Sequence, residues 1–289
     1  MLDQIRGLHH VTSMSRDADA NNHFFTDTLG LRRVKKTVNF DEPSVYHLYY
    51  GDEAGTPGSV MTYFPFPHIV RGRPGTGEVG ETVFSVPEGS LAFWKERFAE
   101  KGVNGVISEE AFGENRLRFA AVDGDSFALV EAKGDSRAPW TGGAVAGDEA
   151  IRGFAGATLR LGDSGTTEEL LKFMGYEHAD TSKGIKRFVI PGGNGADVID
   201  LQTLPNMQRG DLGAGSVHHI AFAVDDREAQ KAVRQALLDT GYQVTPVIDR
   251  DYFYAIYFRT PGGVLFEIAT NEPGFDKDED TAHLGEALK

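Results

Sequence analysis

Two pairs of adjacent histidines and one isolated carboxylate are the residues of this sequence that could perform metal chemistry. The pairs occur in similar contexts, LHHVT around His9 and His10 and VHHIA around His218 and His219. Glu267 lies in the apolar run GGVLFEIAT, where an unpaired buried carboxylate is costly. Two imidazoles and one carboxylate with open coordination positions suit non-haem Fe(II). Strand alternation predicts that one histidine of each pair faces the metal, without deciding which.

Composition restricts the other kinds of chemistry. The 289 residues include no cysteine, which excludes disulfides, thiolate metal sites and cysteine nucleophiles. The net charge of −14 disfavours nucleic acids and anionic membrane surfaces, because phosphates bind Lys and Arg. The N-terminus is too polar for a signal peptide, and no apolar run approaches the ~20 residues of a membrane helix. We therefore expect a cytoplasmic protein without nucleic-acid or membrane partners, and the sequence is compatible with a homo-oligomer.

The elements that must position these residues recur four times along the chain. Residues 5–12 (IRGLHHVT) resemble residues 151–158 (IRGFAGAT), and residues 56–63 (TPGSVMTY) resemble residues 260–267 (TPGGVLFE). Helical periodicity closed by a glycine recurs in four segments, 21–31, 91–103, 167–176 and 229–242. A short apolar segment precedes each helix, and alternating segments typical of strands follow it. We therefore predict an α+β chain of four β-α-β-β-β units, at 5–66, 78–132, 150–204 and 214–270.

The units can be grouped by their order in the sequence. Units one and two then form an N-terminal domain, residues 1–145, and units three and four form a C-terminal domain, residues 146–289. Residues 271–289 follow the last unit as an acidic, polar tail. We expect this tail to pack loosely, as chain ends commonly do.

A repeated β-α-β-β-β unit with His on its first strand and Glu on its last strand resembles the vicinal oxygen chelate superfamily. That group includes glyoxalase I, fosfomycin-resistance proteins and extradiol dioxygenases. The resemblance covers nearly the whole chain, and residues 8–59 are similar to the hydroquinone-type ring-cleaving dioxygenases in particular. It implies two U-shaped mixed-sheet cradles, each built from a pair of units. It also implies an Fe(II) enzyme, with Mn(II) as the other metal, that inserts both atoms of O₂ into a hydroquinone-like or catechol-like substrate.

The resemblance also implies that ligands come from the first and last strands of the units. Aligning the four units gives two residues from each: His10 and Tyr63, Glu81 and Leu129, Gly156 and Asp200, and His219 and Glu267. The set His10, His219 and Glu267 requires units one and four to share a cradle, with units two and three forming the other. If units three and four pair instead, the alternative set is Asp200, His219 and Glu267. We expect Tyr63 to face the metal cradle without binding the metal, and the second cradle to hold no metal.

By the same resemblance, His9, His218, Arg250 and Tyr257 are expected around the metal. Imidazoles titrate near neutral pH and can shuttle protons. The Tyr257 hydroxyl could hydrogen-bond substrate or bound oxygen, and Arg250 could hold an oxyanion. Each also has a packing interpretation, in which the two histidines face the helix layer behind the sheet and Tyr257 is a core aromatic.

For other polar residues near the predicted site, the sequence favours structural roles. Arg250 could simply pair with Asp249 or Asp251, and Asn39 and His47 are more consistent with strand packing than with substrate contact.

Two further functions remain compatible with the residues: a glyoxalase-like lyase or isomerase that needs no O₂, and a metal-free aromatic-binding resistance protein. Glyoxalase sites usually carry a further carboxylate where this alignment places a tyrosine. The favoured partners are therefore a small aromatic substrate and O₂.

Overall fold

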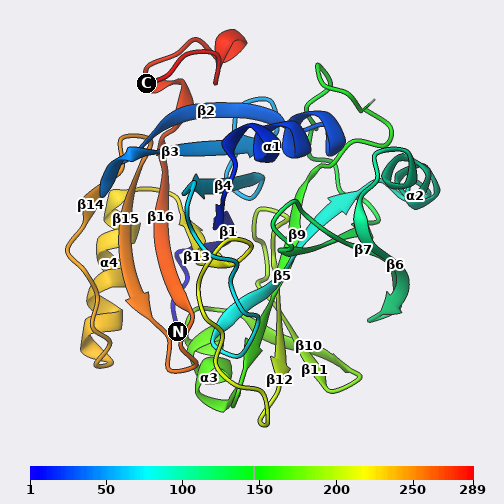
Figure 1. Cartoon of the computed structure of the whole chain (residues 1–289). Helices are drawn as coiled ribbons and strands as arrows, with labels where there is room; N and C mark the ends of the chain where they lie inside the picture. Colours follow the sequence, from blue (N-terminus) through cyan, green and yellow to red (C-terminus); the bar gives the residue numbers. More distant parts are fainter. Residues whose placement is uncertain (146) are drawn as a thin grey trace.

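Two curved eight-stranded mixed sheets form the molecule (Figure 1). The computed structural model describes residues 1–145 and 147–289. One sheet has the strand order β14-β15-β16-β13-β1-β4-β3-β2, and the other has the order β10-β11-β12-β9-β5-β8-β7-β6. We call them sheet 1/4 and sheet 2/3, after the units that they contain. The predicted α+β class with two cradle-shaped sheets is confirmed.

Sheet 1/4 contains the first and last units of the chain. Unit one supplies β1 (Ile5–Ser15), α1 (Ala18–His23) with a following π-helical turn (Phe24–Thr28), β2 (Arg32–Asn39), β3 (Glu42–Gly51) and β4 (Val60–Pro65). Unit four supplies β13 (Val217–Val224), α4 (Arg227–Asp239), β14 (Ile248–Asp249), β15 (Phe253–Arg259) and β16 (Leu265–Pro273). The two first strands pair antiparallel at the centre, and each last strand runs parallel to its own first strand.

Sheet 2/3 repeats this arrangement with the middle units. Unit two supplies β5 (Glu78–Val86), α2 (Leu91–Glu100), β6 (Asn104–Ala111), β7 (Glu114–Ala120) and β8 (Ser126–Glu131). Unit three supplies β9 (Gly153–Leu161), α3 (Gly165–Phe173), β10 (Glu177–Ser182), β11 (Ile185–Val189) and β12 (Val198–Thr203). The predicted pairing of units one with four and two with three is confirmed, and the alternative pairing of units three and four is wrong.

The sheets therefore do not follow the order of the units in the sequence. Each sheet takes one unit from residues 1–145 and one from residues 146–289. The predicted domains group the units by their order in the sequence, whereas sheet 1/4 pairs the first unit with the last. Position 146, where the second half was predicted to begin, lies outside the described residues.

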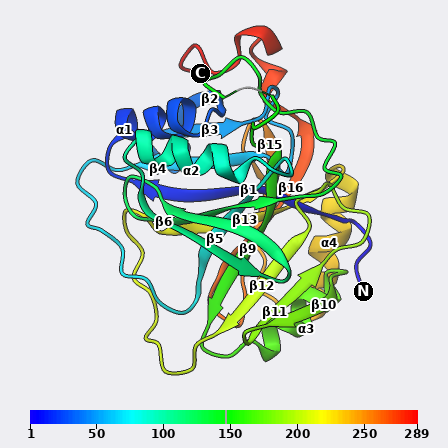
Figure 2. The same cartoon turned by 90° about the vertical axis from the view of Figure 1, so that its right-hand side faces the viewer.

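The helices lie on the periphery of the two sheets (Figures 1 and 2). The inward face of α4 buries Val233 and Leu237 together with Gln230. The predicted closing glycines all have positive φ angles, for example 72° at Gly30 and 89° at Gly241, a conformation that glycine adopts without steric cost. In residues 1–145 and 147–289, no helix has the length and apolarity needed to span a membrane.

The C-terminal tail docks along the edge strand β2, so the expectation of loose packing was wrong. Nζ of the buried Lys35 lies 2.6 Å from Oδ1 of Asp278 and 2.5 Å from Oε2 of Glu279. A β-bridge joins Lys36 to Leu288. Two apolar tail side chains are buried as well, Phe275 and Leu284. The tail therefore covers an otherwise open sheet edge, and its acidic residues neutralise a buried lysine.

Candidate metal centre

Three buried side chains from the two ends of the chain converge in sheet 1/4. Nε2 of His10 lies 3.2 Å from Nε2 of His219 and 3.4 Å from Oε2 of Glu267. Nε2 of His219 lies 2.9 Å from the same carboxylate oxygen. Among the residues that the structure describes, these three form the one group of three or more His, Asp or Glu side chains placed to share a metal ion. The predicted ligands are thus brought together by the central pairing of β1 with β13 and of β13 with β16.

The unmet hydrogen-bonding capacity of this cluster fits a cation. Both carboxylate oxygens of Glu267 are buried without a well-aligned hydrogen bond from the described residues, and Nε2 of His219 approaches Oε2 as an ion-pair contact at 2.9 Å. Leaving a buried acceptor without a well-formed hydrogen bond is costly. Burial alone would raise the pKa of Glu267, but His10 and His219 outweigh it and hold that pKa well below its usual range. Imidazole nitrogens and a carboxylate are donors that suit Fe(II) and related divalent metals. The residues present therefore fit a metal.

His9 fixes the tautomer of His10 from behind. Nε2 of His9 lies 3.1 Å from the carbonyl oxygen of Thr270, which can only accept, so this nitrogen carries the proton. Burial lowers the pKa of His9 to about 3, and the neutral ring leaves Nδ1 as an acceptor. Nδ1 of His10, 2.9 Å away, must then donate to it. The lone pair of His10 is thereby placed on Nε2, toward Glu267, as a metal ligand requires.

The second histidine pair repeats this contact in unit four. Nδ1 of His218 lies 2.8 Å from Nδ1 of His219, and burial lowers the pKa of His218 to about 4. If Nε2 of His219 is a ligand, its Nδ1 donates to His218, whose own proton is then on Nε2. The two pairs differ in their surroundings, because His218 lines the pocket described next, whereas His9 lines a separate hollow behind it.

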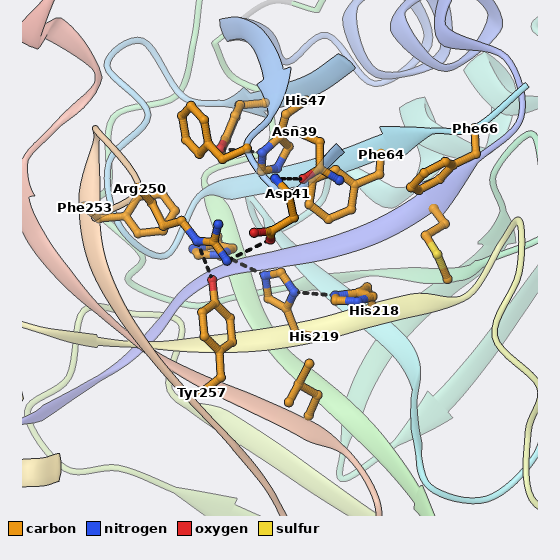
Figure 3. Close-up of a pocket in the computed structure, with 15 residues that line it drawn as sticks. Asn39, Asp41, His47, Phe64, Phe66, His218, His219, Arg250, Phe253 and Tyr257 are labelled. Atoms are coloured by element: carbon orange, nitrogen blue, oxygen red, sulfur yellow. Dashed lines mark hydrogen bonds and ion pairs between the residues drawn. The ribbon is translucent and has the colours of Figure 1, made fainter. Parts of the chain in front are cut away.

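A pocket of about 330 Å³ lies over the cluster (Figure 3). Its walls are mainly apolar, formed by Met14, Phe40, Phe64, Phe66, Phe253 and Leu265. Polar side chains also reach it, among them Asn39, Asp41, His47, His218, Arg250 and Tyr257. This volume is near the lower end of the range for small-molecule sites. The pocket therefore suits a single aromatic ring.

Arg250 and Tyr257 lie together at one side of this pocket (Figure 3). Tyr257 is the direct cross-strand partner of Glu267 between β15 and β16, which places it on the same face. Nε of Arg250 donates to the Tyr257 hydroxyl at 3.3 Å, and its Nη2 donates to Asp41 at 3.1 Å. The ion-pair partner of Arg250 is therefore Asp41 of unit one, and the alternatives Asp249 and Asp251 were wrong. Because its oxygen accepts from Arg250, the Tyr257 proton is free for another acceptor.

Thr62 occupies the position expected for Tyr63. The β1–β4 register pairs Thr12 with Thr62, just as the β13–β16 register pairs Ala221 with Glu267. Thr12 and Ala221 each lie two residues after a histidine of the cluster, so Thr62 is the counterpart of Glu267. Tyr63 faces the opposite side, where its hydroxyl donates to the buried Asp125. A shift of one residue exchanges the two faces of a strand, and the aligned TPGS and TPGG turns differ by that shift.

Thr62 belongs to a hydrogen-bonded chain beside the cluster. Its Oγ1 lies 2.8 Å from Oγ1 of Thr12 and 2.8 Å from Nε2 of His47. Nδ1 of His47 lies 2.7 Å from the hydroxyl of Tyr49. His47 and Asn39, which the sequence favoured as packing residues, both line the pocket. Local sequence gave no signal for this, because their approach depends on the curvature of sheet 1/4.

The equivalent positions of sheet 2/3 are filled by ion pairs. Asp200 accepts two hydrogen bonds from Arg187, each 2.9 Å long, and Glu81 accepts from Arg118 at 2.6 Å. The last-strand counterpart in unit two is Ala128, the partner of Val83, so the assignment of Leu129 was wrong by the same one-residue shift. The alternative ligand set with Asp200 is also wrong, because Asp200 belongs to a different sheet from His219 and Glu267.

This fold and site define the class of protein. The chain belongs to the Glyoxalase/Bleomycin resistance protein/Dioxygenase superfamily, whose sequence profile matches residues 7–268. The superfamily is metal-dependent, and the cluster offers a three-residue metal site. The resemblance expected from the sequence is thereby confirmed.

Particular relatives match the chain over nearly its whole length. MhqO of Bacillus subtilis (strain 168), provisionally named a ring-cleaving dioxygenase, is 43% identical over 289 residues, which are 100% of this chain and 92% of MhqO. The chlorohydroquinone/hydroquinone 1,2-dioxygenase of Sphingobium indicum is 35% identical over 300 residues, covering 99% of this chain and 92% of that enzyme. These homologues carry the names of ring-cleaving dioxygenases, as the sequence resemblance led us to expect.

Solved structures agree with this assignment. A provisionally named dioxygenase from Bacillus subtilis superposes with a TM-score of 0.95 at 42% identity, covering 99% of this chain and 92% of that one. Glyoxalase I from Zea mays superposes with a TM-score of 0.66 at 14% identity, covering 92% of each chain. The second likeness concerns the fold alone.

Proposed function

We propose that this protein is a non-haem Fe(II) dioxygenase that opens a hydroquinone-like aromatic ring, with His10, His219 and Glu267 as the metal ligands. The observation that carries the proposal is the convergence of three buried donor atoms at an aromatic-lined pocket. Three protein ligands leave positions for a substrate hydroxyl and O₂. The hydroquinone named for the Sphingobium relative supports the choice of substrate class. Mn(II), which accepts the same donors, is the second candidate metal.

The overall reaction breaks one carbon–carbon bond of the ring. The bond lies between the hydroxyl-bearing carbon and its neighbour, and one oxygen atom of O₂ ends on each of these carbons. The first becomes a carboxylic acid and the second an aldehyde, so both atoms of O₂ are retained in the product. When bound, the iron brings the substrate hydroxyl and O₂ together and lets electrons pass between them.

The side chains of the pocket supply orientation and proton donors. Walls formed by Phe64, Phe66 and Phe253 hold the ring and exclude water. His218 carries its proton on Nε2 and can donate to an oxygen atom that gains negative charge. On the other side, Tyr257 can donate its hydroxyl proton. Burial and the nearby Glu267 raise the pKa of Tyr257 well above its usual value, and the guanidinium of Arg250, 3.3 Å from the Tyr257 oxygen, partly opposes that rise. Donors fixed in this way favour the charge that develops during reaction.

The same geometry argues against a glyoxalase-like lyase. Thr62 stands at the fourth position of the cradle, where glyoxalase sites usually carry a further carboxylate, and its hydroxyl bonds Thr12 and His47. Among the residues that the structure describes, no carboxylate therefore adds a fourth ligand to the cluster. A lyase would also work with Zn(II) or Ni(II) and without oxygen.

Oxygen consumption is the test that separates these functions. Protein loaded with Fe(II) under anaerobic conditions should consume one O₂ per hydroquinone and yield a ring-opened chromophore. Glu267→Gln should abolish uptake, whereas His178→Gln, at an exposed histidine of sheet 2/3, should not change it. Absence of uptake with every hydroquinone and catechol, or oxygen-independent turnover with Zn(II), would overturn the proposal.

A further inference from the structure

The tip of the β2–β3 hairpin forms a second polar region of the pocket. Asn39 pairs with Glu42 across the hairpin, which leaves Phe40 and Asp41 as the turn. Asn39, Phe40 and Asp41, here called the hairpin tip, all line the pocket. Figure 3 shows the Asn39 side chain on the opposite side of the pocket from Tyr257 and the His219 side chain, with the Asp41 carboxylate between them, next to Arg250. Asn39 therefore faces the end of a bound ring that lies away from the metal cluster.

The side chain of Asn39 is oriented by its own turn. Oδ1 of Asn39 accepts the backbone N–H of Asp41 at 2.9 Å, an arrangement typical of asparagine in turns. The side chain is only 8% exposed. With the carbonyl oxygen committed to the turn, the amide Nδ2 is the free end. Among the described residues, Nδ2 donates no hydrogen bond, and the one hydrogen bond of the Asn39 side chain is that of Oδ1 with the Asp41 N–H.

The neighbouring polar groups already have hydrogen-bond or ion-pair partners. Both ring nitrogens of His47 have partners, Thr62 and Tyr49. Asp41 accepts from Arg250, so its charge is neutralised. Around them the walls are apolar aromatic rings. The Asn39 amide is therefore the N–H donor at this end of the pocket that remains available to a ligand.

We propose that Nδ2 of Asn39 is the specificity-determining donor to the oxygen substituent para to the metal-bound hydroxyl. This inference rests on the proposed function, because it takes the metal cluster to hold the first hydroxyl. A hydroquinone places its second oxygen directly across the ring, within the reach of the hairpin tip. A catechol places both oxygens at the metal end and leaves the amide without an acceptor, which weakens binding. Para-substituted substrates are thereby selected.

Binding of two isosteric phenols isolates this contact. 4-Methoxyphenol carries an acceptor oxygen para to its hydroxyl and no donor there, whereas 4-ethylphenol carries a methylene in its place. Calorimetric titration of anaerobic Fe(II)-loaded protein should show about three- to tenfold tighter binding of 4-methoxyphenol, the usual net value of one neutral hydrogen bond. No turnover is needed for this measurement.

Two variants remove the donor and retain the turn. Asn39→Asp and Asn39→Ser each keep an oxygen that can accept the Asp41 N–H, but neither offers the amide donor. Both should reduce the affinity ratio to about one, with 4-ethylphenol affinity within about twofold of the unsubstituted protein. Asn115→Ser, at an exposed position of β7 in sheet 2/3, should keep the ratio. Thermal unfolding of each variant checks that the fold is retained.

The outcomes separate this inference from the proposed function. A ratio of one in the unsubstituted protein, a ratio that survives both Asn39 substitutions, or equal loss of both phenols would overturn the role of Asn39. Oxygen uptake with hydroquinone in the unsubstituted protein would still support the dioxygenase. Conversely, a ratio that depends on Asn39 without any oxygen uptake would support the recognition site and overturn the proposed reaction.

Discussion

Nδ1 of His9 lies 2.9 Å from Nδ1 of His10, and His9 lines a hollow separate from the pocket over the cluster. The corresponding nitrogens of His218 and His219 lie 2.8 Å apart. The same dipeptide thus supports both proposed histidine ligands, but only His218 also lines the pocket. We infer that His9 orients the metal ligand and that His218 in addition contacts substrate or oxygen.

His9→Phe should therefore weaken metal binding more than it slows the chemical step. Loss of a group that orients a ligand typically costs 10- to 100-fold in metal affinity. Competition with a chromophoric chelator measures this, and kcat at saturating Fe(II) should change much less. His178→Phe is the matched control at an exposed histidine. Unchanged affinity with a large loss of kcat would instead place His9 in the chemistry.

Tyr257→Phe should lower kcat by about 100-fold, the scale of removing one donor to a developing negative charge. Metal content should remain one per chain, because Tyr257 is not among the clustered donors. Arg250→Met should cost a similar factor. Since Nε of Arg250 donates to the Tyr257 hydroxyl, the double variant should lose less than the product of the two factors. Strictly multiplicative losses in steady-state kinetics would show that the residues act independently.

Asp200→Asn should destabilise the fold and leave metal binding intact. Asp200 and Arg187 form a buried, doubly hydrogen-bonded ion pair, and breaking such a pair costs about 3–5 kcal/mol. Denaturant unfolding measures the loss, and elemental analysis measures the metal. Glu267→Gln should show the opposite pattern: it should lose the metal without a comparable loss of stability. Loss of metal from the Asp200 variant at a temperature where it remains folded would contradict this separation of the two sheets.

Asp125→Asn should stabilise the protein above pH 6. Burial raises the pKa of Asp125 from its ordinary value of 3.8 to about 6, so the folded state binds more protons than the unfolded state between these values. The free energy of unfolding therefore falls as pH rises through about 4 to 6. Asparagine resembles the protonated acid and avoids this loss, on the order of 2–3 kcal/mol at neutral pH.

Unfolding curves at several pH values test this expectation. The advantage of Asp125→Asn should shrink toward zero below pH 4, where the aspartate is protonated in both states. Asp123→Asn is the contrasting control, because Asp123 accepts from Arg16 and its removal should destabilise slightly at neutral pH. A pH-independent difference between Asp125→Asn and the unsubstituted protein would refute the assigned titration.

Sequence repeats were sufficient to predict the four units, and the resemblance to the vicinal oxygen chelate superfamily implied their pairing and the cluster of His10, His219 and Glu267. The pairing followed from chemistry, because only one arrangement brings two histidines and a glutamate together. Face assignment failed where it depended on turn length, as at Tyr63, because a shift of one residue turns a side chain to the other side of the strand.

The residues that line the pocket could not be predicted from the local sequence either. Asn39 and Asp41 approach the site only because β2 and β3 curve over the cradle. The sequence of this hairpin does not indicate which strands it will face. The docked tail was missed for a similar reason. Its acidic residues look solvated in the sequence, and only the buried amine of Lys35 explains their position.

The pairing of the first unit with the last also has a consequence for biosynthesis. His10 leaves the ribosome long before Glu267, which is made 257 positions later. The middle units can pair and fold while the first unit still lacks its neighbour strand β13. Closing so long a loop is entropically slow, and domains fold as they emerge. Metal capture by the proposed ligands therefore requires that synthesis has passed β16, and a product truncated before β13 would leave β1 as an open sheet edge for proteases and chaperones to recognise.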